Sequence, residues 1–183
     1  LVGRNFNQKK IESFGKNGVL AIVSDSTNSN VEGHSGSEEK LRDSLVKIIQ
    51  RISQRVAITS FASNLARLET FSYVASHSGR VAALCGRSLW SMYQAALDTG
   101  YLKNIKPFLD EREAMNYPKD QILFICTGSQ GEPRAALSRI ATDIHQNIFL
   151  EAGDTVIFSS KVIPGNERSI TKVQNELKER NIN

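Results

Sequence analysis

The sequence predicts an α/β protein, with a three-layer α/β/α fold built around a mostly parallel sheet. Short apolar runs typical of strands alternate with longer segments whose apolar residues recur every three or four positions. Polar, glycine-bearing stretches follow most of the short runs. Strands that alternate with helices are joined by right-handed crossovers, so helices are expected on both faces of the sheet.

Five short apolar runs are predicted to be strands, because such runs bounded by turn residues are typical of buried parallel strands. They comprise residues 18–23, 55–60, 80–85, 121–126 and 154–158. Residues 148–150 are a further candidate strand. The strand at 18–23 is expected to follow a helix.

The clearest helix is predicted to begin at Ser37, whose hydroxyl suits an N-cap. Glu38 and Glu39 stand in the first turn, where the helix dipole favours acidic side chains, and apolar residues from Leu41 to Ile52 share one face. Pro133 suits a first helical turn, because no partner exists there for the N–H that proline lacks. Further helices are predicted at residues 64–76, 88–99, 110–116, 133–143 and 166–180.

Length and charge bound the function only loosely. A chain of 183 residues fits one compact domain, and its net charge of +4 permits a polyanionic partner but also suits an ordinary basic domain. No apolar run approaches the roughly 18 residues that a membrane span needs. The chain begins at Leu1, without an initiating Met or signal peptide, and stops just after a helix, so we expect a piece of a longer protein.

Polar stretches stand at the end of each predicted strand and carry the functional information. The carboxyl ends of parallel strands share one edge, where open α/β sheets bind ligands. Glycines, hydroxyls and the N-terminal amides of the following helices suit phosphate, with Arg67, Arg87 and Arg134 adding charge. The alternative is that these are ordinary caps and turns. The candidate phosphate-binding residues are Ser63, Asn64, Arg67, Arg87, Ser88, Thr127, Gly128, Ser129, Gln130, Gly131, Ser159, Ser160 and Asn166.

Other chemistries find little support in the sequence. There is no Walker A or G-x-G-x-x-G loop and no G-x-S-x-G nucleophile elbow. The three histidines, His34, His77 and His145, are isolated and are interpreted as surface residues, so no metal ligands are assigned. Cys85 and Cys126 end apolar runs and are interpreted as buried, reduced thiols, although a cysteine nucleophile stays an alternative.

At these loops the sequence resembles the ribonuclease J family of the metallo-β-lactamase superfamily, specifically its β-CASP region. The most specific segments are Thr-Gly-Ser-Gln-Gly-Glu-Pro at residues 127–133 and Ile-Pro-Gly-Asn-Glu at 163–167. The other matching segments are 24–28, 59–64 with Arg67, 86–88, 100–102, Ala136-Leu137 with Arg139, and 158–160. They occur in family order and cover nearly the whole chain.

The resemblance implies a Rossmann-like β-CASP domain over residues 36–183, with residues 1–35 as the end of the metallo-β-lactamase part and its junction. It implies a cytoplasmic ribonuclease of RNA processing and decay, acting endonucleolytically and from the 5′ end, in which this region binds and orients RNA. Two zinc ions would activate water in the full-length protein, whereas this chain would bind none and be inactive alone. No membrane partner is expected, and a homo-oligomer of the full-length protein is left open.

Asp25 is the one residue to which the resemblance gives a catalytic role, that of holding and polarising a catalytic histidine that this chain lacks. Its alternative role is to cap the following turn. Two other functions stay open beside the nuclease. One is a non-catalytic nucleic-acid-binding or assembly module, and the other is a hydrolase of small phosphate esters.

Overall fold

A computed structural model describes residues 7–26, 29–30, 32–33, 37–103 and 105–183 of the chain. Five parallel strands form one sheet in the order β3-β2-β4-β1-β5, and helices cover both faces, so the predicted three-layer α/β/α fold is confirmed. The strands are β1 (Val56–Thr59), β2 (Val81–Cys85), β3 (Leu109–Asp110), β4 (Ile122–Cys126) and β5 (Thr155–Phe158). The α-helices are α1 (Gln8–Asn17), α2 (Glu38–Ile49), α3 (Leu65–His77), α4 (Arg87–Asp98), α5 (Glu111–Ala114), α6 (Ala136–Ala141) and α7 (Glu167–Glu179), and a 3-10 helix, η1, spans Lys119–Gln121.

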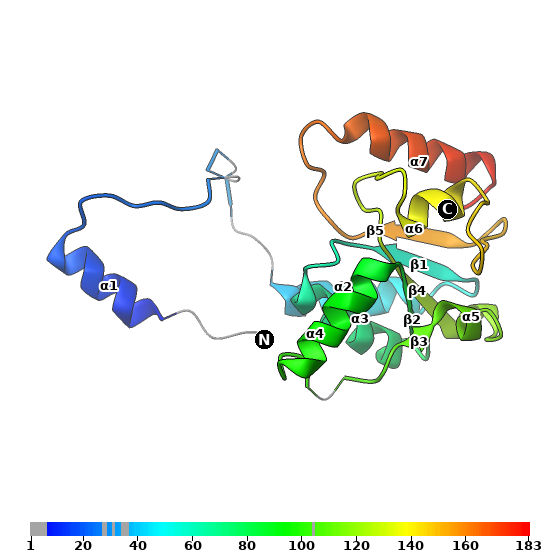
Figure 1. The fold of residues 1–183 in the computed structure, drawn as a ribbon, viewed down its shortest axis with the longest axis horizontal. Coiled ribbons are helices and arrows are strands. Elements are labelled where there is room, and N and C mark those ends of the chain that lie inside the picture. Colours follow the sequence, from blue (N-terminus) through cyan, green and yellow to red (C-terminus); the bar gives the residue numbers. More distant parts are fainter. Residues whose placement is uncertain (1–6, 27–28, 31, 34–36, 104) are drawn as a thin grey trace.

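The two faces of the sheet pack against different helices. One core cluster joins α2, α3 and α4 to side chains such as Ile58 and Leu84, and the other joins α5, α6 and α7 to neighbours such as Ala57 and Phe124. Figure 1 shows α6 and α7 on one side of the sheet and α2, α3 and α4 on the other. Alternate residues of one strand therefore serve opposite layers, which explains why β4 is buried along its whole length.

Side-chain caps fix the starts of two helices, and the first of these caps was predicted from the sequence. The Ser37 hydroxyl accepts a hydrogen bond from the Lys40 backbone N–H at 3.2 Å, which confirms the N-cap of α2. The Asn64 side chain accepts one from the Arg67 N–H at 3.0 Å and fixes the start of α3. Both caps lie where a loop meets a helix, so they also set where the loop ends.

The predicted strand at residues 18–23 is wrong. These residues form no strand, and Leu20 and Val23 have relative exposures of 106% and 100%. A strand needs a neighbouring chain to satisfy its backbone, and apolar composition alone does not provide one. Figure 1 shows α1 and the blue segment after it lying apart from the sheet, and α1 has no buried residue.

Other differences are smaller. The helix predicted at 133–143 begins only at Ala136, because Thr127 holds the first two amides of α6: its hydroxyl accepts from Ala136 N and its carbonyl from Leu137 N. Pro133 therefore precedes the helix instead of opening it. Residues 148–150 are not a strand, although Ile148 and Leu150 are buried core residues. The short β3 was not predicted, since two residues give no periodic signal.

Thr27, Asn28 and His34 lie outside the described residues. In the part of the chain that the structure describes, no helix is long and apolar enough to cross a membrane.

Candidate functional site

Four of the five predicted polar loops lie at one edge of the sheet. They follow β1, β2, β4 and β5, which are mutually parallel, so their carboxyl ends point the same way. The fifth, which begins Ser24-Asp25-Ser26, follows an exposed coil that is not part of the sheet. Asp25 is exposed there, although its side chain or backbone is not without an interaction partner. Its predicted catalytic role stays a prediction.

Gly86 and Thr127 close the edge between the neighbouring strands β2 and β4. A Cβ on Gly86 would lie 2.7 Å from Thr127 Oγ1, and Gly86 has φ of +123°, so glycine is required here on both counts. The Thr127 N–H donates to the Cys85 carbonyl and extends the ladder by one residue. Arg87 and Ser88 follow at the exposed first turn of α4.

Gln130 ties the loop after β4 to the segment after β5. Its side-chain oxygen accepts from Ile163 N at 2.8 Å and from Asn166 Nδ2 at 3.3 Å, while its side-chain nitrogen donates to the Lys161 carbonyl at 2.9 Å. A weaker contact of 3.4 Å reaches Ser160 Oγ. Gln130 is only 5% exposed, so its amide is a buried link between these two segments and not a group on the surface of the edge.

The glycines of this loop allow close packing. Gly128 has φ of +112°, and a Cβ there would lie 3.0 Å from Ala135 Cβ. Gly131 meets the backbone of Ser169 and Ile170 in the first turn of α7 so closely that no Cβ fits. The predicted phosphate-binding role of both glycines stays a prediction, and their packing roles are what the contacts support.

Arg67 joins three elements. Its guanidinium bonds to the Glu38 carboxylate on α2, with Nη2 to Oε1 at 2.9 Å, and to both the carbonyl and the hydroxyl of Ser159 after β5. Burial raises the pKa of Glu38, but hydrogen bonds from Arg67 and Thr70 and the charges of Arg67 and Arg42 outweigh it and leave this pKa below its usual value. The positive charge of Arg67 is therefore already paired within the protein.

Two serine hydroxyls at the edge lack a protein partner. Ser60 Oγ, after β1, and Ser129 Oγ, after the adjacent β4, are both buried and make no hydrogen bond within the described part of the chain. Buried hydroxyls normally find a partner, so these are candidates for contact with a bound molecule. Ser60 carried no role in the sequence-based prediction. Ser63 is exposed at the same edge.

The interpretation of His145 as a surface residue is wrong. Its ring is 2% exposed, and its Nδ1 accepts from the backbone N–H groups of Asn147 and Ile148 at 3.3 and 3.2 Å. Burial and the charge of Arg139 lower the pKa of His145, against an opposing effect of Glu111, whose carboxylate lies 3.8 Å from Nε2. His77 is exposed at the end of α3, as predicted.

The two cysteines are buried and unpaired, as the sequence predicted, and face each other across β2 and β4. Burial, with the neighbouring Cys126 thiol, raises the pKa of Cys85 well above its ordinary value. A thiol held protonated and 0% exposed is a poor nucleophile, which argues against the cysteine alternative.

The described residues do not fit a zinc centre. Nowhere in the described ranges do three or more His, Cys, Asp or Glu side chains gather into a group that could hold a metal ion.

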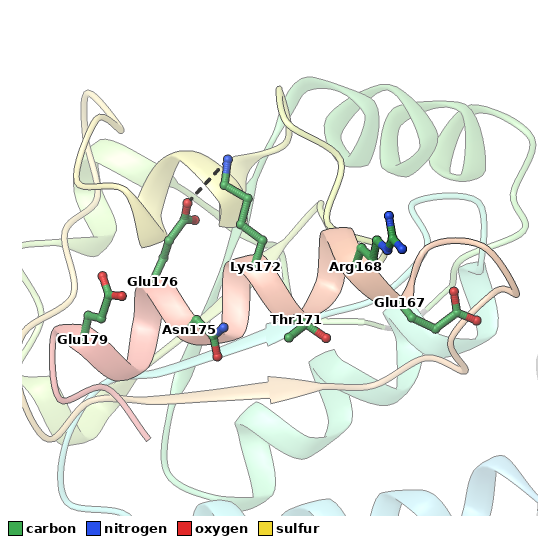
Figure 2. Close-up of a pocket in the computed structure, with 7 residues that line it drawn as sticks. All are labelled: Glu167, Arg168, Thr171, Lys172, Asn175, Glu176 and Glu179. Atoms are coloured by element: carbon green, nitrogen blue, oxygen red, sulfur yellow. Dashed lines mark ion pairs between the residues drawn. The ribbon is translucent and has the colours of Figure 1, made fainter.

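Two hollows differ in their charge. One, of about 610 Å³, runs along the outer face of α7, where three glutamates (Glu167, Glu176, Glu179) outnumber Arg168 and Lys172 (Figure 2). Glu176 also pairs with Lys172 at 3.8 Å. The other, of about 730 Å³, opens at the edge between β2 and β4 and is lined by Arg87, Arg134 and Arg139 together with Thr127 and Glu132. Only the second has the charge that a phosphate needs. Arg139 had no predicted site role, because its position on α6 is not adjacent to a strand end.

Comparisons with known proteins agree with this picture. The family model described as "Ribonuclease J, beta-CASP domain" matches residues 53–177. The chain is 44% identical over 176 residues to "Ribonuclease J" of Sinorhizobium meliloti, and this alignment covers 96% of the chain and 31% of that protein. It is 40% identical over 179 residues to "Ribonuclease J 1" of Streptococcus pyogenes (97% and 32%) and 37% identical over 164 residues to "Ribonuclease J2" of Bacillus subtilis (89% and 30%).

The chain thus spans about a third of the length of the curated relatives it matches. The match to the family model extends over more than half of the chain. The most specific segments of the sequence resemblance, residues 127–133 and 163–167, lie in the loops at the edge of the sheet. The chain belongs to the ribonuclease J β-CASP domain family.

Proposed function

We propose that this chain is the RNA-binding region of a zinc-dependent ribonuclease that acts in RNA processing and decay in the cytoplasm. Membership of the ribonuclease J β-CASP domain family is the observation that carries the proposal. The edge formed by the loops after β1, β2, β4 and β5 would hold the RNA, because it gathers glycines, hydroxyls, helix N-termini and arginines. Cleavage preference should be broad, since phosphate contacts carry little sequence information.

In this proposal, the metal-dependent cleavage step takes place at residues outside the described ones. Two metal ions in the longer protein would stabilise the attacking and leaving oxygens of the phosphodiester. Asp25 would position a histidine of the longer protein, and the edge would orient the RNA. The protein would cleave RNA both internally and from the 5′ end, and its oligomeric state is left open.

The proposal is tested on the longer protein that contains this chain, with single-stranded RNA as substrate. A chelator should abolish cleavage, and added zinc should restore it. Asp25→Ala should lower kcat at least tenfold and change KM little, whereas Asp43→Ala, at an exposed site on α2, should leave both unchanged. Wild-type kcat in Asp25→Ala would remove the role of this residue, and cleavage that resists the chelator would remove metal dependence.

A second candidate is a non-catalytic nucleic-acid-binding module. The lack of a metal-binding group among the described residues favours it for the chain taken alone. It predicts that the longer protein binds RNA with strong salt dependence but does not cleave it under any metal condition.

A further inference from the structure

One arginine holds both ends of the segment between α6 and β5. Arg180, just after α7, donates hydrogen bonds to the Asp143 carboxylate at 2.9 Å and to the Leu150 carbonyl at 2.8 Å. Between these two points, residues 144–149 belong to no helix or strand. Within this stretch two backbone N–H groups donate to the ring of His145, so its conformation depends on the state of that ring.

The hydrogen bonds of His145 fix where its proton lies. Nδ1 accepts from the backbone N–H groups of Asn147 at 3.3 Å and of Ile148 at 3.2 Å. A ring nitrogen that accepts hydrogen bonds carries no proton, so the proton of the neutral ring is on Nε2. The second proton of a charged ring must bind to Nδ1, on the lone pair that the two N–H groups share. Proton uptake therefore breaks both hydrogen bonds, and the ring is only 2% exposed, which leaves little room for water to replace them.

His77 shows the opposite arrangement. Its Nδ1 lies 2.8 Å from the Tyr73 carbonyl oxygen, which can only accept, so Nδ1 carries the proton of the neutral ring. The second proton binds to Nε2 and breaks no hydrogen bond to the backbone. Of these two histidines, only His145 links proton uptake to the conformation of the chain, and His77 is an internal control.

Charged side chains from two helices act on the His145 ring in opposite directions. Glu111, the first residue of α5, has its Oε2 3.8 Å from Nε2 and favours the charged ring, whereas Arg139 on α6 disfavours it. Burial has the largest effect and leaves the pKa of His145 below its ordinary value of 6.5. Asp143, two residues before His145, is already paired with Arg180 at 2.9 Å. The ring is therefore neutral near pH 7 and takes up its proton on acidification.

We propose that His145 is a pH-sensitive switch: a proton taken up at Nδ1 releases the backbone of residues 144–149, while Arg180 keeps both ends of the segment in place. The closed state holds at neutral pH, where Nδ1 accepts from both N–H groups. In the open state the charged ring has a carboxylate within reach, because Asn147 Nδ2 bonds to Glu111 Oε1 at 2.6 Å and leaves Oε2 for the ring. The switch is a property of the fold and does not rest on the proposed function.

The open state exposes more apolar surface than the closed state. Ile148 is 2% exposed in the closed state, and its neighbours Ile144 and Phe149 are already 68% and 48% exposed. Once the Ile148 N–H has lost its acceptor, packing alone holds this side chain, so local opening becomes easier. Acidification should therefore increase the apolar surface of the segment while the sheet stays intact.

The test follows the isotope-labelled chain by NMR from about pH 7.5 to about pH 5. At neutral pH the ring nitrogen signals should place the proton on Nε2 in His145 and on Nδ1 in His77. As the pH falls, the protection of the Asn147 and Ile148 amides from hydrogen exchange, corrected for the intrinsic effect of pH, should drop about tenfold or more. The midpoint should coincide with that of the His145 Nδ1 signal. The amide of Ile125 in β4 should keep its protection, because the opening is local.

Two charge variants separate the switch from a general loosening by acid. Glu111→Gln keeps an oxygen that can accept from the Asn147 side chain but removes the charge beside Nε2, so the midpoint should fall. Arg139→Gln removes the opposing positive charge, so the midpoint should rise. Each shift should be about 0.5 pH unit or more. The matched control is Arg51→Gln, an exposed site beside Gly79 at the other end of β2, which should leave the midpoint unchanged.

Several outcomes would overturn the switch. Constant protection of Asn147 and Ile148 while His145 gains its proton would mean that proton uptake does not open the segment, and a ring that stays neutral down to about pH 5 would mean that no switch operates. Loss of protection at Ile125 at the same pH would mean that the whole domain unfolds together. Midpoint shifts in the same direction in Glu111→Gln and Arg139→Gln would contradict the assigned charges.

Discussion

Gly86 and Thr127 touch across two strands so tightly that a methyl group on the glycine would lie 2.7 Å from the threonine hydroxyl. The same hydroxyl caps α6 by accepting from the Ala136 N–H at 3.1 Å. One contact therefore fixes the end of β2, the end of β4 and the start of α6.

Gly86→Ala should lower the free energy of unfolding by about 2–4 kcal/mol, because strain at φ of +123° adds to the steric overlap with Thr127. Urea denaturation measures this. Gly79→Ala is the matched control, since Gly79 also has a positive φ (+72°) but open space around its Cα, and should cost about 1 kcal/mol. Equal losses in both variants would mean that the contact with Thr127 is unimportant.

Gln130→Ala should loosen the segment from Ser160 to Asn166. The truncated side chain loses its hydrogen bonds with the Ile163 N–H and the Lys161 carbonyl, and water can replace these bonds only in part, so we expect a loss of about 1–2 kcal/mol. Hydrogen exchange should accelerate at Ile163 and at Asn166 more than in β1. The control is Gln94→Ala, which removes an exposed hydrogen bond to Asp98 and should change neither the free energy of unfolding nor the exchange rates. Unchanged exchange at Ile163 in Gln130→Ala would show that the Gln130 side chain does not hold this segment.

Asp154→Asn should be among the more destabilising single-atom changes. This carboxylate is 0% exposed, accepts from the backbone N–H groups of Arg55 and Glu151, and lies 3.6 Å from the buried Arg55 guanidinium. An amide cannot accept all of these bonds and leaves Arg55 poorly compensated, so a loss of about 2–4 kcal/mol is expected in thermal or urea unfolding.

The control for this change is Asp143→Asn. Asp143 also pairs with an arginine, Arg180, at 2.9 Å, but its side chain is 64% exposed. Exposed pairs contribute about 1 kcal/mol or less, so Asp143→Asn should be nearly neutral. Similar losses at the two positions would show that burial does not set the cost.

His145 should make stability depend on pH. Its folded pKa lies below the ordinary value of 6.5, mainly because burial disfavours the charged ring. Above pH 6.5 the ring is neutral in both states and its contribution is complete. As the pH falls below 6.5 the unfolded chain takes up the proton first, so stability is lost until the folded pKa is reached.

The variant that isolates this effect is His145→Asn, whose side-chain oxygen can still accept from the Asn147 N–H two residues on. The stability difference between wild type and His145→Asn should change between pH 7.5 and 5.5, with the wild type losing more on acidification. His77→Asn should keep the wild-type profile, since it leaves His145 in place. A difference that is constant with pH would rule out the buried, neutral ring.

The sequence predicted most of the fold because each correct strand carried its own signal, and the two core faces follow from strand and helix alternation. It failed at residues 18–23, where apolar side chains such as Leu20 look like a strand but no described segment pairs with them. It also misplaced His145, because the burial of a polar ring depends on distant residues such as Glu111.

The candidate site was predictable to a similar extent. The loops at the strand ends were found because parallel strands place their carboxyl ends together. That Arg67 is neutralised by Glu38, whereas Arg139 is left with an unpartnered donor, depends on how α2, α3 and α6 pack, and no spacing in the sequence encodes that.

Gly131 has a mechanical consequence. Because its backbone abuts that of Ser169 and Ile170, the loop after β4 cannot shift toward α7 without displacing the first turn of that helix. The far end of α7 returns to the sheet, where Asn183 N–H bonds to the Asp154 carbonyl and its own carbonyl accepts from Val156 N–H. We therefore expect a ligand held on this loop to restrain the first turn of α7, whose other end is already anchored to the sheet through Asn183.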